Sequence, residues 1–266
     1  MSAPAPGLTG GVLVLGHRGS QTSCRPENTV AAVSAALDSG ADGVEVDVRL
    51  SADGVLLCSH DARVGVPSGR ALTVATKDAA QLRRLFLPGG HRLATLTEVL
   101  QAVGQYTGAR LVVEVKPVAD PATALRTVRA LRRAFARNPG LDVTVSSFDA
   151  DLLRAVRGAC DGLIARTALL GEPGETTHDL LRQVVADGHD ELHVPLAALR
   201  WAPQVVEAAH SVGVAVTCWA VNLAGDLRWV GEQGVDAVIT DDVVTARAAL
   251  AGLTAHEAAR VQQTAC

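Results

Sequence analysis

The feature that most constrains the fold of this chain is a regular alternation of short apolar runs with longer amphipathic segments. The runs are rich in β-branched residues, as buried strands are, and each amphipathic segment has helical periodicity. Eight such runs occur, at residues 12–15, 43–48, 111–115, 143–146, 163–166, 192–195, 214–219 and 237–240. Helices are predicted at 27–39, 97–106, 121–137, 150–158, 177–186, 202–212, 223–233 and 243–251.

Eight strand–helix units in a chain of 266 residues predict an α/β fold, a closed (β/α)8 TIM barrel. An open, doubly wound sheet is the alternative. The interval 49–94, between the second and third barrel strands, is long and contains a further predicted strand at 55–59. We interpret it as a small insertion over the barrel mouth. A single domain is therefore expected over residues 1–266, with its core at about 12–251 and a flexible C-terminal tail at about 254–266.

Composition narrows the possible partners. Hydrophobic residues make up 48% of the chain and aromatic residues only 3%, so the core is expected to be mostly Ala, Val and Leu. A net charge of −4 argues against a nucleic acid partner. The five cysteines form no Cys-x-x-Cys pair, which favours reduced thiols over a disulfide framework or a zinc site. Nothing resembles an export signal or a membrane span, so a cytoplasmic location is expected; the oligomeric state is left open.

Several predicted strands carry charged residues, which are costly in a buried strand unless they are paired or metal-bound. Glu45 and Asp47 are two residues apart and therefore share one face of their strand, and Glu114 and Lys116 repeat this pattern on the next. Three carboxylates at neighbouring strand ends would repel one another without a cation between them. Their oxygen atoms favour one hard divalent cation, Mg²⁺ or Ca²⁺. Ion pairs, such as Glu114 with Lys116, are the structural alternative.

Two further strand ends carry histidines. His17 and Arg18 follow the first strand, and His60 and Asp61 follow the additional strand of the insertion. Arg18 and Lys116 are suited to phosphate oxygens, and the two histidines to a proton-transfer pair. A metal site, phosphate-binding cations and a histidine pair together indicate cleavage of a phosphodiester. The other histidines, at positions 91, 178, 189, 193, 210 and 256, lie in no motif.

An ordered series of motifs resembles the glycerophosphodiester phosphodiesterase family over about residues 12–250. The motifs are HRG at 17–19, PENT at 26–29, GADGVEVDVR at 40–49, DGVLLCSHD at 53–61, ATLTEVL at 94–100, VEVKP at 113–117, SF at 147–148, CWAVN at 218–222 and DAVITD at 236–241. The chain departs from the family pattern at residues 62–69 and at 240–243, where a frequent proline is absent. Both departures leave the preferred head group open.

The resemblance implies roles for individual positions. The metal ligands would be Glu45, Asp47 and Glu114, and the general acid and base His17 and His60. Arg18 and Lys116 would bind phosphate, and Trp219 and Phe148 would line the pocket. Supporting positions are Glu27 and Asn28 at the start of the first helix, Asp61 beside His60, and Asp241 as a brace at a strand end.

The implied activity is metal-dependent hydrolysis of a small glycerophosphodiester to sn-glycerol 3-phosphate and an alcohol. Attack by the substrate's own hydroxyl through a cyclic phosphate and direct attack by water both remain open, as does which histidine is the acid. Activity of the lysophospholipase D type on lysophospholipids is the nearest alternative. A barrel acting on sugar phosphates and a non-catalytic barrel are more distant ones.

Overall fold

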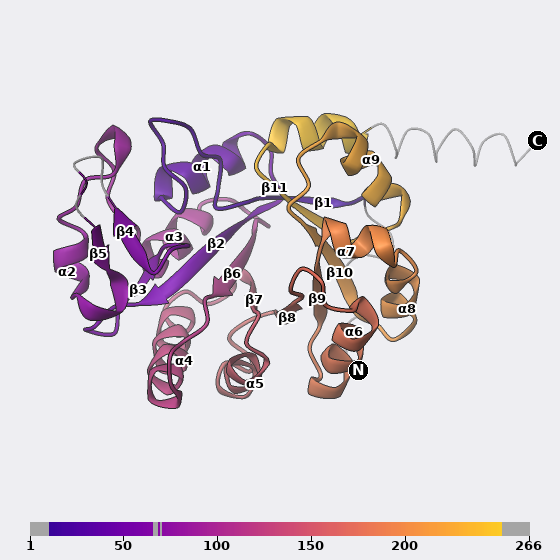
Figure 1. Ribbon diagram of the computed structural model, residues 1–266. Coiled ribbons are helices and arrows are strands. Elements are labelled where there is room, and N and C mark those ends of the chain that lie inside the picture. The colour runs from indigo at the N-terminus through magenta and orange to yellow at the C-terminus, as the bar shows by residue number, and fades with distance from the viewer. Residues whose placement is uncertain (1–10, 66–68, 70, 252–266) are drawn as a thin grey trace, which may run out of the picture.

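Eight parallel strands close into a barrel in the computed structural model, which describes residues 11–65, 69 and 71–251 (Figure 1). The strands are β1 (Leu13–Gly16), β2 (Gly43–Leu50), β6 (Arg110–Val115), β7 (Asp142–Ser147), β8 (Arg166–Leu170), β9 (Glu191–Pro195), β10 (Ala215–Trp219) and β11 (Ala237–Thr240). The barrel closes because β1 pairs with both neighbours, Leu13 with Ala237 on β11 and Leu15 with Gly43 on β2. The predicted TIM barrel is confirmed.

Helices pack around the outside of this barrel. They are α1 (Val30–Asp38), α3 (Leu96–Val103), α4 (Pro121–Ala136), α5 (Ala150–Ala159), α6 (Thr177–Asp187), α7 (Leu196–Trp201), α8 (Val205–Ser211) and α9 (Ala224–Glu232), and residues 243–251 are also helical. Local sequence sets where they begin. The Asp120 side chain accepts from the backbone N–H of Thr123, with Pro121 as the first residue of α4. Thr95 and Glu98 form a capping box at α3.

Several predicted boundaries were wrong, and two of them have a clear physical reason. The strand expected at 163–166 begins only at Arg166, because Leu163 and Ile164 lie in the preceding connection and pack there against the core. The helix expected at 202–212 begins only at Val205, as α8, and a further short helix, α7, ends before it at Trp201. Ala202 adopts φ −143° and ψ 64° directly before Pro203, which disfavours a helical conformation in the residue that precedes it.

The insertion between β2 and β6 forms its own small unit beside β2. Its elements are β3 (Leu56–Cys58), β4 (Arg63–Gly65), β5 (Ala71–Thr73), η1 (Val74–Thr76), α2 (Ala79–Leu82) and η2 (Pro88–Gly90). The strand β3 extends the barrel sheet by antiparallel pairing with β2, and β4 pairs with β5. A separate apolar cluster that includes Leu57, Val74 and Leu82 holds the unit together. The tail predicted at 254–266 lies outside the described residues.

No helix within the described ranges has the length and apolar character needed to cross a bilayer. Cys24, Cys58, Cys160 and Cys218 are free thiols.

The barrel interior has an apolar part and a charged part. Leu15, Val112 and Ile239 belong to an apolar cluster inside the barrel. The charged part centres on Glu191, which is fully buried and contacts Arg110, Arg166 Nε at 2.7 Å and His193 Nε2 at 3.1 Å.

Burial alone would raise the pKa of Glu191, but Arg110, His193 and Arg166 together lower it to about 2. Because the folded-state pKa lies below the ordinary value of 4.5, the paired carboxylate stabilises the fold above that pH, and this contribution is lost as the pH falls toward 2. We expect Glu191→Gln to lower the unfolding free energy at pH 7 by about 3–5 kcal/mol, since it leaves Arg110 and Arg166 uncompensated. The variant should also show a shallower fall in stability between pH 4.5 and 2. Urea unfolding across this range tests both, and equal slopes in variant and wild type would contradict the prediction.

Candidate active site

A pocket of about 260 Å³ opens at the carboxyl ends of the barrel strands. This is the end at which TIM-barrel enzymes carry their active sites. Most of the positions singled out from the sequence line it, namely His17, Arg18, Glu45, His60, Glu114, Lys116, Phe148 and Trp219. They come from β1, β2, β6, β7, β10 and the insertion, so closure of the barrel brings them together.

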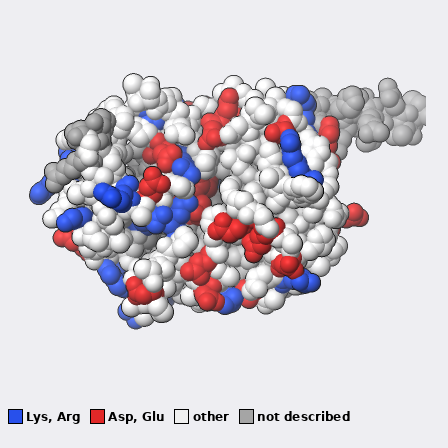
Figure 2. Space-filling view, in the orientation of Figure 1, with Lys and Arg blue, Asp and Glu red and all other residues white. Residues whose placement is uncertain are grey.

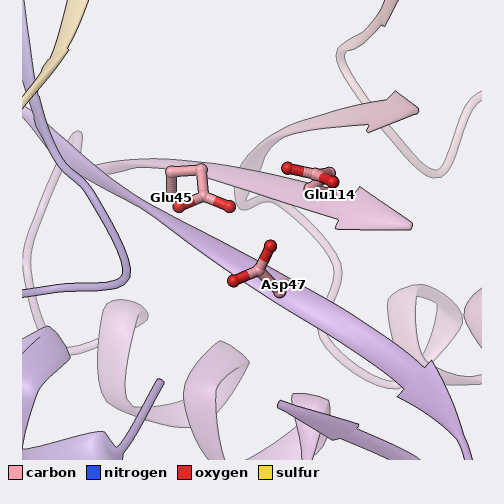
Figure 3. Close-up of side chains that lie close together, drawn as sticks. All are labelled: Glu45, Asp47 and Glu114. Atoms are coloured by element: carbon pink, nitrogen blue, oxygen red, sulfur yellow. The ribbon is translucent and has the colours of Figure 1, made fainter. Parts of the chain in front are cut away.

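The three acidic positions converge at one place (Figure 3), where Glu45 and Glu114 line the pocket and Asp47 lies behind its lining. Glu45 and Asp47 lie on the same face of β2, and Glu114 is the register partner of Asp47 on β6. One ligand oxygen from each residue lies within 4.8 Å of the other two. All three side chains are buried or nearly so, with Glu45 and Asp47 only 3% and 1% exposed.

Two basic side chains partly offset this negative charge, and both of them contact Asp47. Lys116 Nζ lies 2.7 Å from Asp47 Oδ1 and 2.5 Å from Glu114 Oε1, and Arg18 Nε lies 3.1 Å from Asp47 Oδ2. Burial would raise the pKa of Asp47, yet Lys116 and Arg18 lower it. Burial, then the charges of Asp47 and Glu114, raises the pKa of Glu45 well above its ordinary range. Burial and Asp47 likewise raise the pKa of Glu114, although Lys116 opposes this.

The donor set fits a divalent cation. Glu45 Oε2 accepts from the backbone N–H of Arg18 at 3.0 Å, but Glu45 Oε1 is buried and has no hydrogen-bond partner among the described residues. A buried carboxyl oxygen without a partner is costly, and the ion pairs expected as the structural alternative leave it unsatisfied. Three carboxylates that converge on one point offer the oxygen ligands that Mg²⁺ and Ca²⁺ prefer.

The segment before α1 holds Asp47 in place. Asn28 donates from Nδ2 to Asp47 Oδ2 at 2.8 Å, and its Oδ1 accepts from the backbone N–H of Asp47 at 3.0 Å. Asn28 and Arg18 both have positive φ, 57° and 54°, which is uncommon outside glycine and is often found at functional sites. Thr29 caps α1, because its side chain accepts a hydrogen bond from the backbone N–H of Ala32. Asn28 therefore does not cap the helix, and its side chain anchors Asp47 on β2. Glu27 accepts from Arg18 Nη1 at 3.0 Å and 3.1 Å and orients that guanidinium.

Each histidine of the pocket is paired with a carboxylate. His17 Nδ1 lies 2.7 Å from Asp241 Oδ1, and Asn222 holds Asp241 by donating to Oδ2 at 2.6 Å and accepting from the Asp241 N–H at 2.9 Å. His60 Nδ1 lies 2.9 Å from Asp61 Oδ1. The hydrogen bond from His17, ahead of the opposing effect of burial, lowers the pKa of Asp241. Since Nδ1 is engaged in both rings, Nε2 is the nitrogen left for substrate.

Two aromatic rings form a wall of the pocket. Phe148 and Trp219 meet edge to face, with ring centroids 5.9 Å apart and an interplanar angle of 85°. Trp219 Nε1 is buried and lacks a hydrogen-bond partner among the described residues. This wall suits the carbon part of a substrate and offers it one polar contact.

Sequence reasoning missed two positions. Asn222 lies in the CWAVN motif but had no role assigned, and His193 was set aside because no motif surrounds it. His193 lines the pocket. Strand alternation was the available signal, since it places His193 on the same inward face as Glu191.

The fold and this pocket define a TIM-barrel enzyme, and comparison with known proteins identifies its family. The model of the glycerophosphoryl diester phosphodiesterase family matches residues 17–245, and the chain belongs to this family of enzymes. The protein named probable glycerophosphodiester phosphodiesterase 1 in Mycobacterium tuberculosis is 35% identical over 248 residues, which cover 86% of this chain and 88% of that protein. A glycerophosphodiester phosphodiesterase of Caldanaerobacter subterraneus is 30% identical over 88% of this chain and 95% of its own.

Solved structures share the fold. The glycerophosphodiester phosphodiesterase of Thermotoga maritima superposes with a TM-score of 0.72 at 28% identity, over 88% of this chain and 96% of that one. A phosphodiesterase of Oleispira antarctica, solved in complex with the product sn-glycerol-3-phosphate, has a TM-score of 0.78 at 24% identity, over 90% of this chain and 96% of that one.

Proposed function

We propose that this protein hydrolyses small glycerophosphodiesters to sn-glycerol 3-phosphate and an alcohol, with one divalent cation and with His17 and His60 as acid and base. The observation that carries the proposal is that both histidines line the same pocket as Glu45, Glu114 and Lys116. Family membership and the product bound to the Oleispira relative support the substrate class.

Glu45, Asp47 and Glu114 would hold the cation, Mg²⁺ or Ca²⁺. When bound, it supplies electrophilic stabilisation of the phosphoryl oxygens. Arg18 and Lys116 neutralise the remaining phosphate charge, because both lie at the edge of the carboxylate cluster. Asn28 keeps Asp47 directed toward this point.

The two histidines have complementary tasks. One takes a proton from the attacking nucleophile, which is either water or a hydroxyl of the substrate whose cyclic phosphate water then opens, and the other gives a proton to the departing alkoxide. Asp241 and Asp61 accept from Nδ1 and stabilise the protonated rings, so that Nε2 carries the transferred proton. Phe148 and Trp219 hold the carbon part of the substrate.

A second candidate substrate is a lysophospholipid. A hollow of about 510 Å³ adjoins the pocket, shares Pro173 with it and is lined by Ala197, Ala198 and Trp201. Trp201 is 89% exposed beside it, which suits contact with an acyl chain.

A substrate panel tests the proposal. Glycerophosphodiesters and lysophospholipids are offered at saturating Mg²⁺ or Ca²⁺, and glycerol 3-phosphate is detected by a coupled enzyme. We expect release from the glycerophosphodiesters. Trp201→Ala should lower only lysophospholipid turnover if the hollow binds an acyl chain. No glycerol 3-phosphate from any glycerophosphodiester would contradict the proposal.

Figure 2 shows basic residues scattered among acidic ones on the face that it presents, without a continuous basic band, which supports a small-molecule substrate over a nucleic acid. The free thiols support a reducing, cytoplasmic location. We also propose that the chain is a single domain with its core at about residues 12–251 and with the insertion attached to β2.

A further inference from the structure

His193 lies in the pocket without a task in the proposed chemistry. It sits on β9, is fully buried and lines the pocket. Its Nδ1 has no hydrogen-bond partner among the described residues. An unsatisfied buried polar atom costs about 1–3 kcal/mol, so a fully buried histidine in this state calls for a ligand.

The partner of the other ring nitrogen, Nε2, determines whether Nδ1 acts as a hydrogen-bond donor or acceptor. Glu191 Oε2 lies 3.1 Å from His193 Nε2, and Arg110 and Arg166 also contact Glu191. The arginines keep Glu191 ionised, and an ionised carboxylate only accepts hydrogen bonds. Nε2 therefore donates to Glu191, and in that tautomer Nδ1 presents its lone pair as an acceptor.

The neighbouring strands do not satisfy this acceptor. The register partners of His193 are Leu170 on β8 and Thr217 on β10. Leu170 has no donor in its side chain. The Thr217 hydroxyl is buried and, within the described residues, has no hydrogen-bond partner of its own.

The pocket offers a matching donor. Trp219 Nε1 is also buried without a partner in the described part of the chain, and Trp219 lines the pocket together with His193. An acceptor and a donor in one pocket complement a hydroxyl group, which both donates and accepts. Leu170 and Ile239 contribute apolar side chains to the same lining.

We propose that His193 is a specificity-determining residue, whose Nδ1 accepts a hydrogen bond from a hydroxyl group on the carbon part of the bound phosphodiester. Trp219 Nε1 donates to the same hydroxyl. This inference rests on the proposed function and deepens it. The hydroxyl belongs either to the glycerol part or to the alcohol part of the substrate, and the two sources have the same chemistry.

The test measures kcat/KM on a parent diester and on two analogues, each of which lacks one hydroxyl. The parent joins glycerol 3-phosphate to ethylene glycol. One analogue replaces the glycerol part by propane-1,2-diol, which keeps the hydroxyl next to the phosphoester, and the other replaces ethylene glycol by ethanol. We expect the kcat/KM of wild type to be about tenfold or more lower on one analogue than on the parent, because the polar atoms of the pocket are left unpaired.

The variants assign this loss to His193. His193→Leu should lower kcat/KM on the parent by a similar factor and no longer distinguish the parent from that analogue. His193→Gln keeps an acceptor oxygen and should retain part of the discrimination, and it provides the readout if His193→Leu does not fold. Thr217→Val, which removes the neighbouring buried hydroxyl outside the pocket lining, is the matched control and should discriminate as wild type does.

The outcomes separate the two claims. Wild type that hydrolyses all three diesters equally well overturns the role of His193. So does a His193→Leu variant that discriminates as wild type does. If His193→Leu does not fold, the role is overturned when His193→Gln keeps the full discrimination and Thr217→Val loses it. Wild type that hydrolyses none of the three contradicts the proposed function itself.

Discussion

Exhaustive removal of divalent cations is expected to reduce turnover of a glycerophosphodiester to background, and addition of Mg²⁺ or Ca²⁺ should restore it. The reason lies in the three converging carboxylates, which Lys116 and Arg18 satisfy only in part and which leave Glu45 Oε1 without a partner in the described structure. Without the cation, both electrophilic stabilisation and charge balance are lost. Steady-state rates before and after dialysis against EDTA measure this. Activity that survives complete chelation would rule out the metal-dependent mechanism.

Thermal unfolding provides a second readout of the metal site that does not depend on activity. A cation at 100 times its dissociation constant should stabilise the wild type by about 2.7 kcal/mol, seen as a rise in Tm. Glu45→Gln should lose most of this rise while the metal-free variant melts no lower than wild type, because it removes a buried carboxylate that two others repel. Glu207→Gln, an exposed change on α8, is the control and should keep the full rise.

His17→Ala and His60→Ala are each expected to lower kcat by at least ~10²-fold, the usual contribution of a positioned acid or base. Both imidazoles line the pocket and are oriented through Nδ1, by Asp241 and Asp61. The double variant should lose less than the product of the single losses, because residues that act in one step are not additive. Single-turnover rates at saturating metal measure the effect.

A matched histidine keeps this experiment interpretable. His178 is exposed on α6 and lines the adjoining hollow but not the pocket, so His178→Ala should turn over a small glycerophosphodiester, which has no acyl chain, at the wild-type rate. Wild-type turnover in both His17→Ala and His60→Ala would exclude the proposed acid and base.

Most of the fold was predictable from local sequence pattern. Alternation of strand and helix depends on side-chain periodicity within a few residues, and it identified the barrel. Its errors came where an apolar residue packs on the core from a connection, as at Leu163, or where a proline breaks a helical pattern, as at Pro203. In both cases an apolar side chain is at least partly buried, and burial alone does not show whether its backbone is a strand, a helix or a connection.

The part of the site that was predictable from sequence is the part in which one strand carries two site residues. Glu45 and Asp47 share a face of β2 whatever the rest of the chain does, because side chains alternate along a strand. The clustering of Glu114 with them followed from the order of neighbouring strands, and the structure brings the three together.

By itself, the sequence determined the strand and helix units, the face on which each inward residue lies and the acidic and histidine positions at the strand ends. Only the tertiary structure decided which of these groups meet. Asp241 reaches His17 across 224 positions because β1 and β11 close the barrel. Glu191, which Arg110 and Arg166 from two other strands contact, occupies His193 Nε2, and His193 Nδ1 has no partner in the described part of the chain. Hydrogen-bond partners of this kind depend on distances in space, and local periodicity does not encode them.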